Sequence, residues 1–415
     1  MRAHDSKMSA LVARLLIDRA MRISKHQARM FLALAMSMVL AGCGVGDASR
    51  GPTGIDMRIY RQPTALATPL ALDHVAEGFE TSCGLTATGE GWCWGANDHG
   101  QLGAGTSLTC SGGNTACSWR PVQVAAPMLF KELSPAQVHS CGLDIAGQAW
   151  CWGMGLGGQL GDGLSTDSTT PVAVAGGHHF VHIDAGRESL LSCALDDAGI
   201  AWCWGPAGAG TLGNGTTDAA AVPTQVLGPQ PFVSIGTGSE HACALDASGQ
   251  AWCWGHNHYG TLGLGVPGAA LVPKPVVGAL VFKSLAVGGE FTCGLTTAGA
   301  AYCWGFALSL GDGSGQHHDT PQPVSGGHAF ASLTAGYQHA CGLTADGSAW
   351  CWGPSALLGD GSGQETLVPM AVAGGNRFRV VQAGGVATCA ISLAGKSMCW
   401  GSNALGAVGQ SDVDP

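Results

Sequence analysis

The sequence predicts an all-β fold, a seven-bladed β-propeller, and three observations carry this prediction. One pattern, Cys-[Gly/Ala]-[Leu/Ile]-x-x-x-Gly-x-x-x-Cys-Trp-Gly, occurs seven times, with starts separated by 58, 52, 50, 50, 48 and 48 residues. The segments between copies read as short strands without a helical period. Glycine is abundant, 67 of 415 residues, as tight turns require. Since one such unit cannot bury both its faces alone, radial repetition is the expected solution.

Each copy of the pattern is predicted to be a β-hairpin. In the first copy two short apolar segments, 83–86 and 91–94, flank a turn that contains Gly89. This turn places Cys83 opposite Cys93, and opposed residues of antiparallel strands have close Cβ atoms. The same ten-residue gap recurs in every copy, which predicts one disulfide per hairpin. The alternative is a pair of buried free thiols. The predicted pairs are Cys83–Cys93, Cys141–Cys151, Cys193–Cys203, Cys243–Cys253, Cys293–Cys303, Cys341–Cys351 and Cys389–Cys399.

Two further strands complete each predicted blade. A segment of the form Phe-x-x-[Ile/Leu/Val], such as Phe180 to Ile183, precedes most hairpins and alternates like a half-buried strand. A Gly-rich loop ending in Leu-Gly follows each hairpin, and a short strand with Pro comes next, as in 171–174. Proline is tolerated at the start of a strand or at a sheet edge. Each unit therefore contains about four strands.

The ring is expected to close through N-terminal strands. The seventh copy ends near Pro415 without a following Pro-containing strand or Phe strand. Residues 68–78 show this missing pattern at the other end of the chain. We therefore expect 68–78 to pair with the C-terminal hairpin, which removes open sheet edges. The predicted propeller spans 64–415.

Residues 1–42 are predicted to be a targeting segment. A basic region precedes an apolar run at 31–40, too short to span a bilayer comfortably, and Leu40-Ala41-Gly42-Cys43 follows. This arrangement resembles the bacterial lipoprotein signal, which implies that Cys43 becomes the lipidated first residue. The alternatives are an ordinary secretory signal or a membrane anchor, and Met21 or Met30 is a possible true start.

The predicted location is the bacterial cell envelope. Residues 43–63 contain Gly, Pro, Ser, Arg and Asp without apolar periodicity and are predicted to be a flexible tether. Gly44 rather than Asp follows Cys43, and by analogy with lipoproteins this favours the outer membrane.

The remaining cysteines fit an exported protein. Of 17 cysteines, 14 lie in the hairpins. Cys110 and Cys117 lie in the longest insertion, 107–118, and are predicted to pair with each other. Cys43 is then left as the lipid carrier. An exported chain lies in a compartment where such disulfides persist.

The charge disfavours nucleic acid as a partner. Seven of the 18 Lys and Arg residues and two of the 28 Asp and Glu residues precede Cys43, so the net charge from Cys43 onward is −15. Binding to a phosphate backbone needs positive charge.

No catalytic residue, metal site or cofactor is predicted. His256-Asn257-His258, His317-His318-Asp319 and His178-His179 lie in loops, where variation is a simpler interpretation than metal binding. The Gly-Asp-Gly segments at 161–163, 311–313 and 359–361 suggest turns rather than calcium sites.

The segment from Trp94 to Gly103, Trp-Gly-Ala-Asn-Asp-His-Gly-Gln-Leu-Gly, resembles the most recognisable part of the regulator of chromosome condensation repeat. The resemblance extends over about 64–409 and implies a seven-bladed propeller. Bacterial proteins of this fold include an inhibitor that docks onto β-lactamases, so the resemblance is compatible with a protein partner.

Two classes of function follow. The first is a non-enzymatic, monomeric binding propeller displayed on the envelope, with an unidentified protein partner bound by variable rim loops. The alternative is a propeller-type lyase with acid and base residues in the central channel. Guanine-nucleotide exchange, as in the founding family member, is a fold-level analogy only, and an exported acidic lipoprotein has no access to a nuclear GTPase.

Overall fold

The computed structural model divides into two units, Met1–Ala48 and Ser49–Pro415, and the residues described all belong to the second unit. They are residues 59–66, 70–105, 116–186, 189–229 and 231–409. The predictions for the signal segment and for Cys43 therefore lie outside the described residues.

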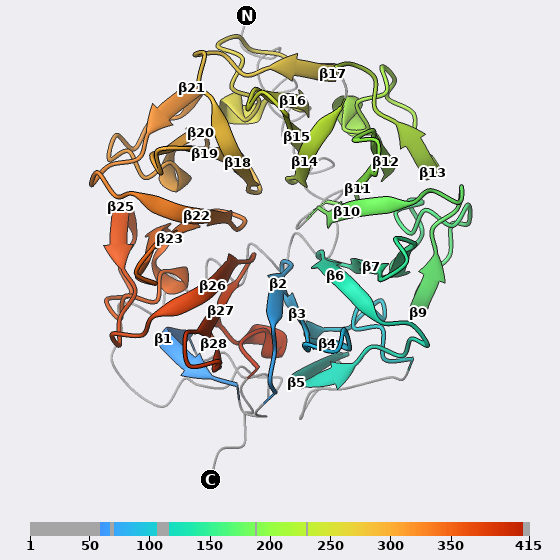
Figure 1. Cartoon of the computed structure of the whole chain (residues 1–415), viewed down its shortest axis with the longest axis horizontal. Helices are drawn as coiled ribbons and strands as arrows, with labels where there is room; N and C mark the ends of the chain where they lie inside the picture. Colours follow the sequence, from blue (N-terminus) through green and yellow to red (C-terminus); the bar gives the residue numbers. More distant parts are fainter. Residues whose placement is uncertain (1–58, 67–69, 106–115, 187–188, 230, 410–415) are drawn as a thin grey trace, which may run out of the picture. The chain divides into compact units, whose positions relative to one another are not determined.

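Seven four-stranded antiparallel sheets form the blades of a propeller, as predicted, and Figure 1 shows them arranged around one axis. Blade 1 contains β2 (His74–Glu77), β3 (Thr81–Leu85), β4 (Gly91–Ala96) and β5 (Cys117–Gln123). Blade 2 contains β6 (Phe130–Pro135), β7 (His139–Asp144), β8 (Ala149–Gly153) and β9 (Ser168–Ala173). Blade 3 contains β10 (Phe180–Ala185), β11 (Ser192–Asp196), β12 (Ala201–Gly205) and β13 (Ala220–Gln225).

The remaining blades repeat this order. Blade 4 contains β14 (Phe232–Thr237), β15 (His241–Asp246), β16 (Ala251–Gly255) and β17 (Ala270–Pro275). Blade 5 contains β18 (Phe282–Val287), β19 (Phe291–Thr296), β20 (Ala301–Gly305) and β21 (His318–Pro323). Blade 6 contains β22 (Phe330–Ala335), β23 (Ala340–Thr344), β24 (Ala349–Gly353) and β25 (Thr366–Ala371). Blade 7 contains β26 (Phe378–Ala383), β27 (Ala387–Ser392), β28 (Ser397–Ser402) and β1 (Ile59–Ala65).

Short 3₁₀ turns follow the third strand of several blades. They are η1 (Gly208–Gly210), η2 (His258–Gly260), η3 (Ala307–Ser309), η4 (Ser355–Leu357) and η5 (Ala404–Gly406). The first four lie between the third and fourth strands of blades 3 to 6, and η5 follows β28 in blade 7.

The hairpin register matches the prediction in all seven blades. Cys141 is opposite Cys151 across β7 and β8, with Cα atoms 4.1 Å apart, the close spacing of an antiparallel pair without backbone hydrogen bonds. The turn between them is held by Asp144, whose Oδ1 accepts the backbone N–H groups of Ala146 and Gln148. An Asp in this position stabilises a tight turn, and the turn sets the register.

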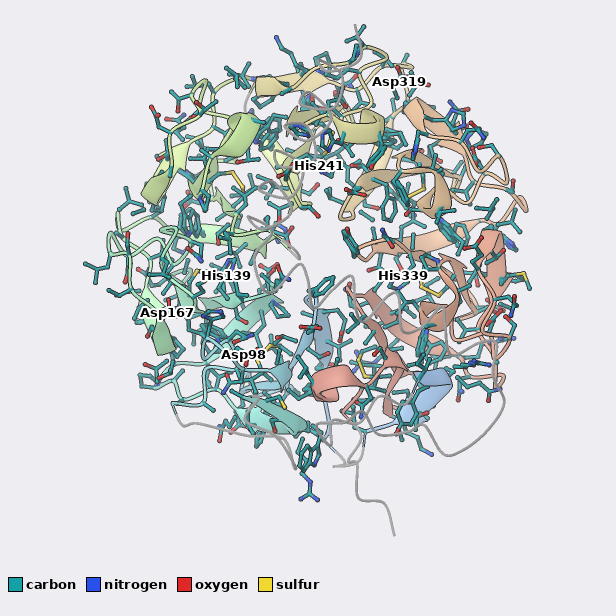
Figure 2. All side chains as sticks on the ribbon, turned by 180° about the vertical axis from the view of Figure 1, so that it is seen from behind. Asp98, His139, Asp167, His241, Asp319 and His339 are labelled. Atoms are coloured by element: carbon teal, nitrogen blue, oxygen red, sulfur yellow. A yellow bond between two sulfur atoms is a disulfide. The ribbon has the colours of Figure 1, made fainter. Side chains whose placement is uncertain are left out.

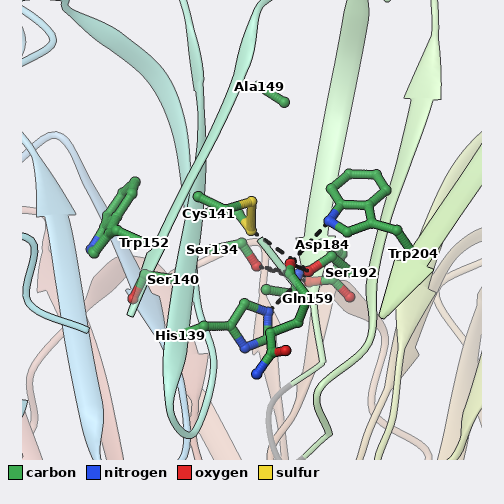
Figure 3. The surroundings of a disulfide bond; sticks show 12 residues. Ser134, His139, Ser140, Cys141, Ala149, Trp152, Gln159, Asp184, Ser192 and Trp204 are labelled. Atoms are coloured by element: carbon green, nitrogen blue, oxygen red, sulfur yellow. Dashed lines mark hydrogen bonds between the residues drawn. A yellow bond between two sulfur atoms is a disulfide. The ribbon is translucent and has the colours of Figure 1, made fainter. Parts of the chain in front are cut away.

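One hydrogen bond repeats between neighbouring blades. The indole Nε1 of Trp204 in blade 3 donates to the carbonyl oxygen of Gln159 in blade 2 at 3.0 Å (Figure 3). The equivalent Trp of every other blade makes the same bond to the preceding blade. Gly161 has a φ of +69°, and a Cβ there would approach the Trp204 nitrogen to 2.6 Å. The Trp of the next blade therefore leaves no room for a side chain at this position, which explains why each loop ends in Gly.

An N-terminal strand closes the ring, but it is not the segment predicted. β1 pairs antiparallel with β28, so that Tyr60 is opposite Gly401, whereas 74–77 form β2 and pair with β3 in blade 1. The predicted segment 68–78 was therefore wrong, and the predicted tether 43–63 overlaps β1 at 59–63. The physical reason is that β28 would otherwise have an unpaired edge, which β1 covers as the outer strand of blade 7. Pro63 in β1 has the edge position that Pro121 has in β5, the outer strand of blade 1.

Candidate functional site

The predicted cysteine sites are structural. The seven hairpin disulfides all form as predicted, and their sulfur-bearing residues are buried. Cys117 is buried in β5, while its predicted partner Cys110 lies outside the described residues, so that pairing stays a prediction.

Three buried histidines, in blades 2, 4 and 6, each contact the next blade. His139 contacts Ser192 of the next blade, with Nε2 and Oγ 2.9 Å apart, and His241 and His339 contact Thr292 and Thr388 in the same way (Figures 2 and 3). The Ser192 hydroxyl donates to the Gln159 carbonyl, so the His139 Nε2 must donate to Ser192. Burial lowers the pKa of His139 to about 3 and that of His241 to about 4. His139 and His241 are therefore neutral near pH 7 and pack one blade against the next.

A polar cluster lines the central channel. The channel holds a cavity of about 270 Å³ bounded by the first strands of the blades. Within it, His182 Nδ1 lies 2.7 Å from Glu132 Oε1, and its Nε2 donates to the Ile235 carbonyl at 3.0 Å. Asp184 accepts the backbone N–H and the hydroxyl of Thr237. The cluster thus connects blades 2, 3 and 4.

The charge state of His182 makes this cluster an ion pair. Burial alone would lower the pKa of His182, but the hydrogen bond and charge of Glu132, with Asp184, outweigh burial and raise it to about 9. His182 is therefore a cation near neutral pH, already engaged through both nitrogens. A general base must be unprotonated near the working pH, so this cluster is poorly suited to acid–base catalysis.

Above the junction of blades 4 and 5 lies a group of ionisable and aromatic side chains that we call the blade 4–5 cluster. Its members are Glu240, His256, His258, Tyr259, Glu290, Phe306 and His317. Tyr259 and His317 are stacked with ring centroids 4.5 Å apart, and Phe306 lies 5.2 Å from Tyr259. Tyr259 is 43% exposed although its ring is held by two neighbours.

The backbone of Tyr259 is unusual. Its φ is +55°, a left-handed conformation that an aromatic residue rarely adopts. Ala209 and Leu405 take the same conformation at the equivalent turn of blades 3 and 7, whereas blades 1 and 2 have other residues in a turn of different conformation. A strained backbone under an exposed aromatic side chain is a reason to suspect function.

Glutamates and histidines of the cluster lie close enough to share a ligand. Donor atoms of Glu240, His256 and His258 all lie within 4.8 Å of one another. Glu290 lies across the same small cavity, and burial, opposed by His258 and reinforced by Glu240, raises the pKa of Glu290. The sequence analysis named His256 and His258 but neither glutamate. A complete hairpin, β15 and β16, separates Glu240 from His256, and Glu290 belongs to the next blade, so no local motif connects them.

The other loop histidines and aspartates occupy ordinary positions. The His178 ring packs on Trp202 at 4.0 Å, and His318 Nε2 lies 3.1 Å from Asp312 Oδ2. Asp162, Asp312 and Asp360 each accept a backbone N–H two residues on, which agrees with the turn interpretation. None of them belongs to a group of three potential metal ligands among the described residues.

Two family models, both described as the regulator of chromosome condensation (RCC1) repeat, match this chain. One matches residues 73–101, 232–261 and 330–363, and the other matches 88–144, 146–192, 198–245 and 248–295. Together the matches cover more than half of the sequence and six of the seven blades.

Known proteins of this fold resemble the chain in part. The E3 ubiquitin-protein ligase HERC2 of Mus musculus is 28% identical over 189 residues, which are 44% of this chain but only 4% of the ligase. Human WBSCR16 superposes with a TM-score of 0.71 at 20% identity, covering 86% of this chain and 94% of its own. Yeast RCC1 (Prp20), solved bound to Kap60, superposes with a TM-score of 0.67 at 21% identity, covering 82% and 81%. These similarities show the fold alone.

Proposed function

Because this chain belongs to the regulator of chromosome condensation (RCC1) repeat family, we propose that it is a non-enzymatic propeller, anchored to the bacterial cell envelope, that binds a protein partner. The blade 4–5 cluster is the proposed docking surface.

The exposed stack of Tyr259, His317 and Phe306 is the observation that carries this proposal. Aromatic side chains are enriched where protein interfaces gain most of their binding energy. Holding Tyr259 at positive φ costs folding free energy, of the order of 1–3 kcal/mol for such a residue. Ala209 and Leu405 take the same conformation in blades 3 and 7, so the turn belongs to the repeat, and what distinguishes blade 4 is the exposed aromatic ring on that turn.

The partner is expected to present basic residues beside an apolar contact. Glu240 and Glu290 line a small cavity with His258, the residue before Tyr259, and the chain from Cys43 onward has a net charge of −15. Opposite charge around an apolar contact raises the association rate and excludes unsuitable partners. The fold is compatible with such a role, since the solved yeast propeller is bound to the protein Kap60.

The seven buried disulfides suggest an oxidising compartment outside the cytosol. No helix among the described residues is long and apolar enough to cross a bilayer. A lipid on Cys43 is the proposed anchor, and 43–58 then serve as the tether. Replacing Cys43 by Ser is expected to release the protein into the soluble fraction, and variant protein that stays entirely in the membrane fraction contradicts the proposal.

A catalytic alternative has less support. A lyase would need free acid and base groups in the central channel, but Glu132, His182 and Asp184 are engaged with one another or with the backbone. Nucleotide exchange rests on fold analogy alone.

Site-specific photocrosslinking in intact cells tests the docking surface. A benzophenone amino acid in place of Tyr259 is expected to capture one protein, while the same substitution at Ala209, the equivalent turn position of blade 3, is the matched control. Capture of the same protein with equal yield from both positions, or from neither, overturns the assignment of this surface.

A further inference from the structure

Two histidines and a glutamate from one blade converge beside a small cavity. Glu240 lies in the turn between β14 and β15, His256 directly follows β16, and His258 begins η2. We propose that Glu240, His256 and His258 bind one divalent transition-metal ion of the Zn²⁺ type. The site shares Glu240 with the proposed docking surface, so a bound ion would offset part of the negative charge there, and metal titration tests it separately from partner capture.

The ligand spacing fits a bridging ion better than a direct bond. His256 Nδ1 lies 3.7 Å from Glu240 Oε2. This separation is too long for a hydrogen bond, which needs about 2.7–3.2 Å. Two ligands that each lie about 2.0–2.1 Å from one tetrahedral Zn²⁺ are roughly 3.4 Å apart. A shift of a few tenths of an ångström would therefore place both atoms on one ion.

The Nδ1 atom of His256 lacks a hydrogen-bond partner in the described part of the chain. It is buried from solvent, although the ring as a whole is 29% exposed. A buried nitrogen without a partner costs free energy, and coordination to a metal would remove that cost. The rings of His256 and His258 also lie edge to face with centroids 3.7 Å apart. Two imidazoles and a carboxylate form a donor set suited to zinc.

The backbone holds the ligands in place. The N–H of His256 donates to the carbonyl oxygen of Glu240 at 2.8 Å, which connects the two ligand-bearing segments. The Thr261 hydroxyl donates to the His256 carbonyl, and Asn257 bridges Leu262 and Val266 with its side chain. Equivalent side-chain bonds occur in blades 1, 3 and 7, so the repeat itself fixes the backbone that carries His256 and His258.

The repeat itself supplies an internal comparison. The same backbone hydrogen bond joins Glu80 to Ala96 in blade 1, Val138 to Met154 in blade 2 and Glu290 to Phe306 in blade 5. In those blades the position of His256 therefore carries Ala96, Met154 or Phe306, none of which offers the nitrogen or oxygen donor of a Zn²⁺ site. Blade 4 is the one blade in the described residues where a group of three donors forms.

Glu290 of blade 5 completes the surroundings of the proposed ion. It lines the same cavity of about 60 Å³ together with Ser239 and Gly289. Its carboxylate is not one of the three mutually close ligands, but it adds negative charge beside the proposed ion.

Calorimetric titration of the mature, tag-free protein with ZnSO₄ after chelator treatment tests the proposal. One equivalent is expected to bind. His258→Ala should weaken binding by more than the roughly 10–100-fold that loss of an outer-shell partner costs, and Glu240→Gln should weaken it with little change in shape. The matched control is His179→Ala, which removes an exposed histidine near Asp197 and should leave the affinity unchanged.

Substitution with Co²⁺ provides a second readout. Tetrahedral coordination should give visible absorption that disappears in His256→Ala and His258→Ala, while disulfide content and melting temperature show that the variants are folded. Equal Zn²⁺ affinity in wild type and His258→Ala, or equal loss in the His179→Ala control, overturns the proposal.

Discussion

The contacts between blades and the blade 4–5 cluster are built on the same repeated backbone, but they differ in burial and in how often they occur. Between blades, each Trp is fully buried and donates to a carbonyl of its neighbour, and this arrangement occurs seven times. In the blade 4–5 cluster, Tyr259 and His258 are exposed, and their combination with Glu240 occurs in one blade. The repeated positions therefore maintain the fold, whereas function is expected where the repeat varies.

The largest effect is expected at a buried Trp. Trp204→Ala should reduce the free energy of unfolding by about 3–5 kcal/mol, since it leaves a large cavity between blades 2 and 3. The matched control is Trp202→Ala on the same strand, whose half-buried ring bonds Asp196 Oδ2 and should cost clearly less. Chemical denaturation of both variants measures the difference. Equal losses would contradict the division between buried and surface positions.

A single disulfide should matter less than a Trp. The double replacement Cys243→Ala and Cys253→Ala opens a loop of ten-residue separation, for which loop entropy predicts a loss of roughly 2.5–3 kcal/mol. The propeller should remain assembled, because the neighbouring blades still pack on blade 4. Thermal unfolding and size-exclusion chromatography test this, and loss of the folded ring would show that one bridge is indispensable.

Acid should destabilise the contacts between blades through the buried histidines. The pKa values of His139 and His241 in the folded state, about 3 and about 4, lie below the unfolded value of 6.5. As pH falls below 6.5 the unfolded chain binds protons that the folded chain does not, so stability falls, by about 2 kcal/mol per histidine between pH 7 and 5.

Replacing both histidines by Gln keeps a donor near each Nε2 position and removes the ionisable group. The double variant should therefore lose less stability than wild type between pH 7 and 5, measured by denaturation at each pH. An unchanged pH dependence would mean that carboxylates cause the whole effect. His182 should act in the opposite direction, because its pKa is raised to about 9 and its contribution is lost only as pH rises through that value.

The smallest change is expected at Tyr259. Tyr259→Gly removes the strain of a positive φ and should leave stability unchanged or raise it by up to about 1 kcal/mol. Ala209→Gly, at the equivalent turn with a φ of +52°, should have a similar effect. Under the proposed function, partner capture is lost in Tyr259→Gly alone. A marked destabilisation by Tyr259→Gly would instead assign the aromatic stack to folding.

Features that depend on short separations in the chain could be predicted from the sequence. The number of blades, the hairpin register and the pairing of Cys141 with Cys151 follow from a spacing of ten residues and one turn. The Leu-Gly motif was recognised as a repeat, but its cause, the approach of Trp204 to Gly161, involves a different blade and was not predictable.

Contacts between distant segments were decided only by the tertiary structure. The closing strand contains Pro63, whereas the sequence analysis predicted the segment 68–78, because a proline at a sheet edge is a local signal that many segments satisfy. His256 and His258 were visible as a pair, yet only the hydrogen bond of the His256 backbone to Glu240 brings the carboxylate beside them. Local turns thus determine register and repeat number, whereas the packing of one blade on the next determines which side chains meet.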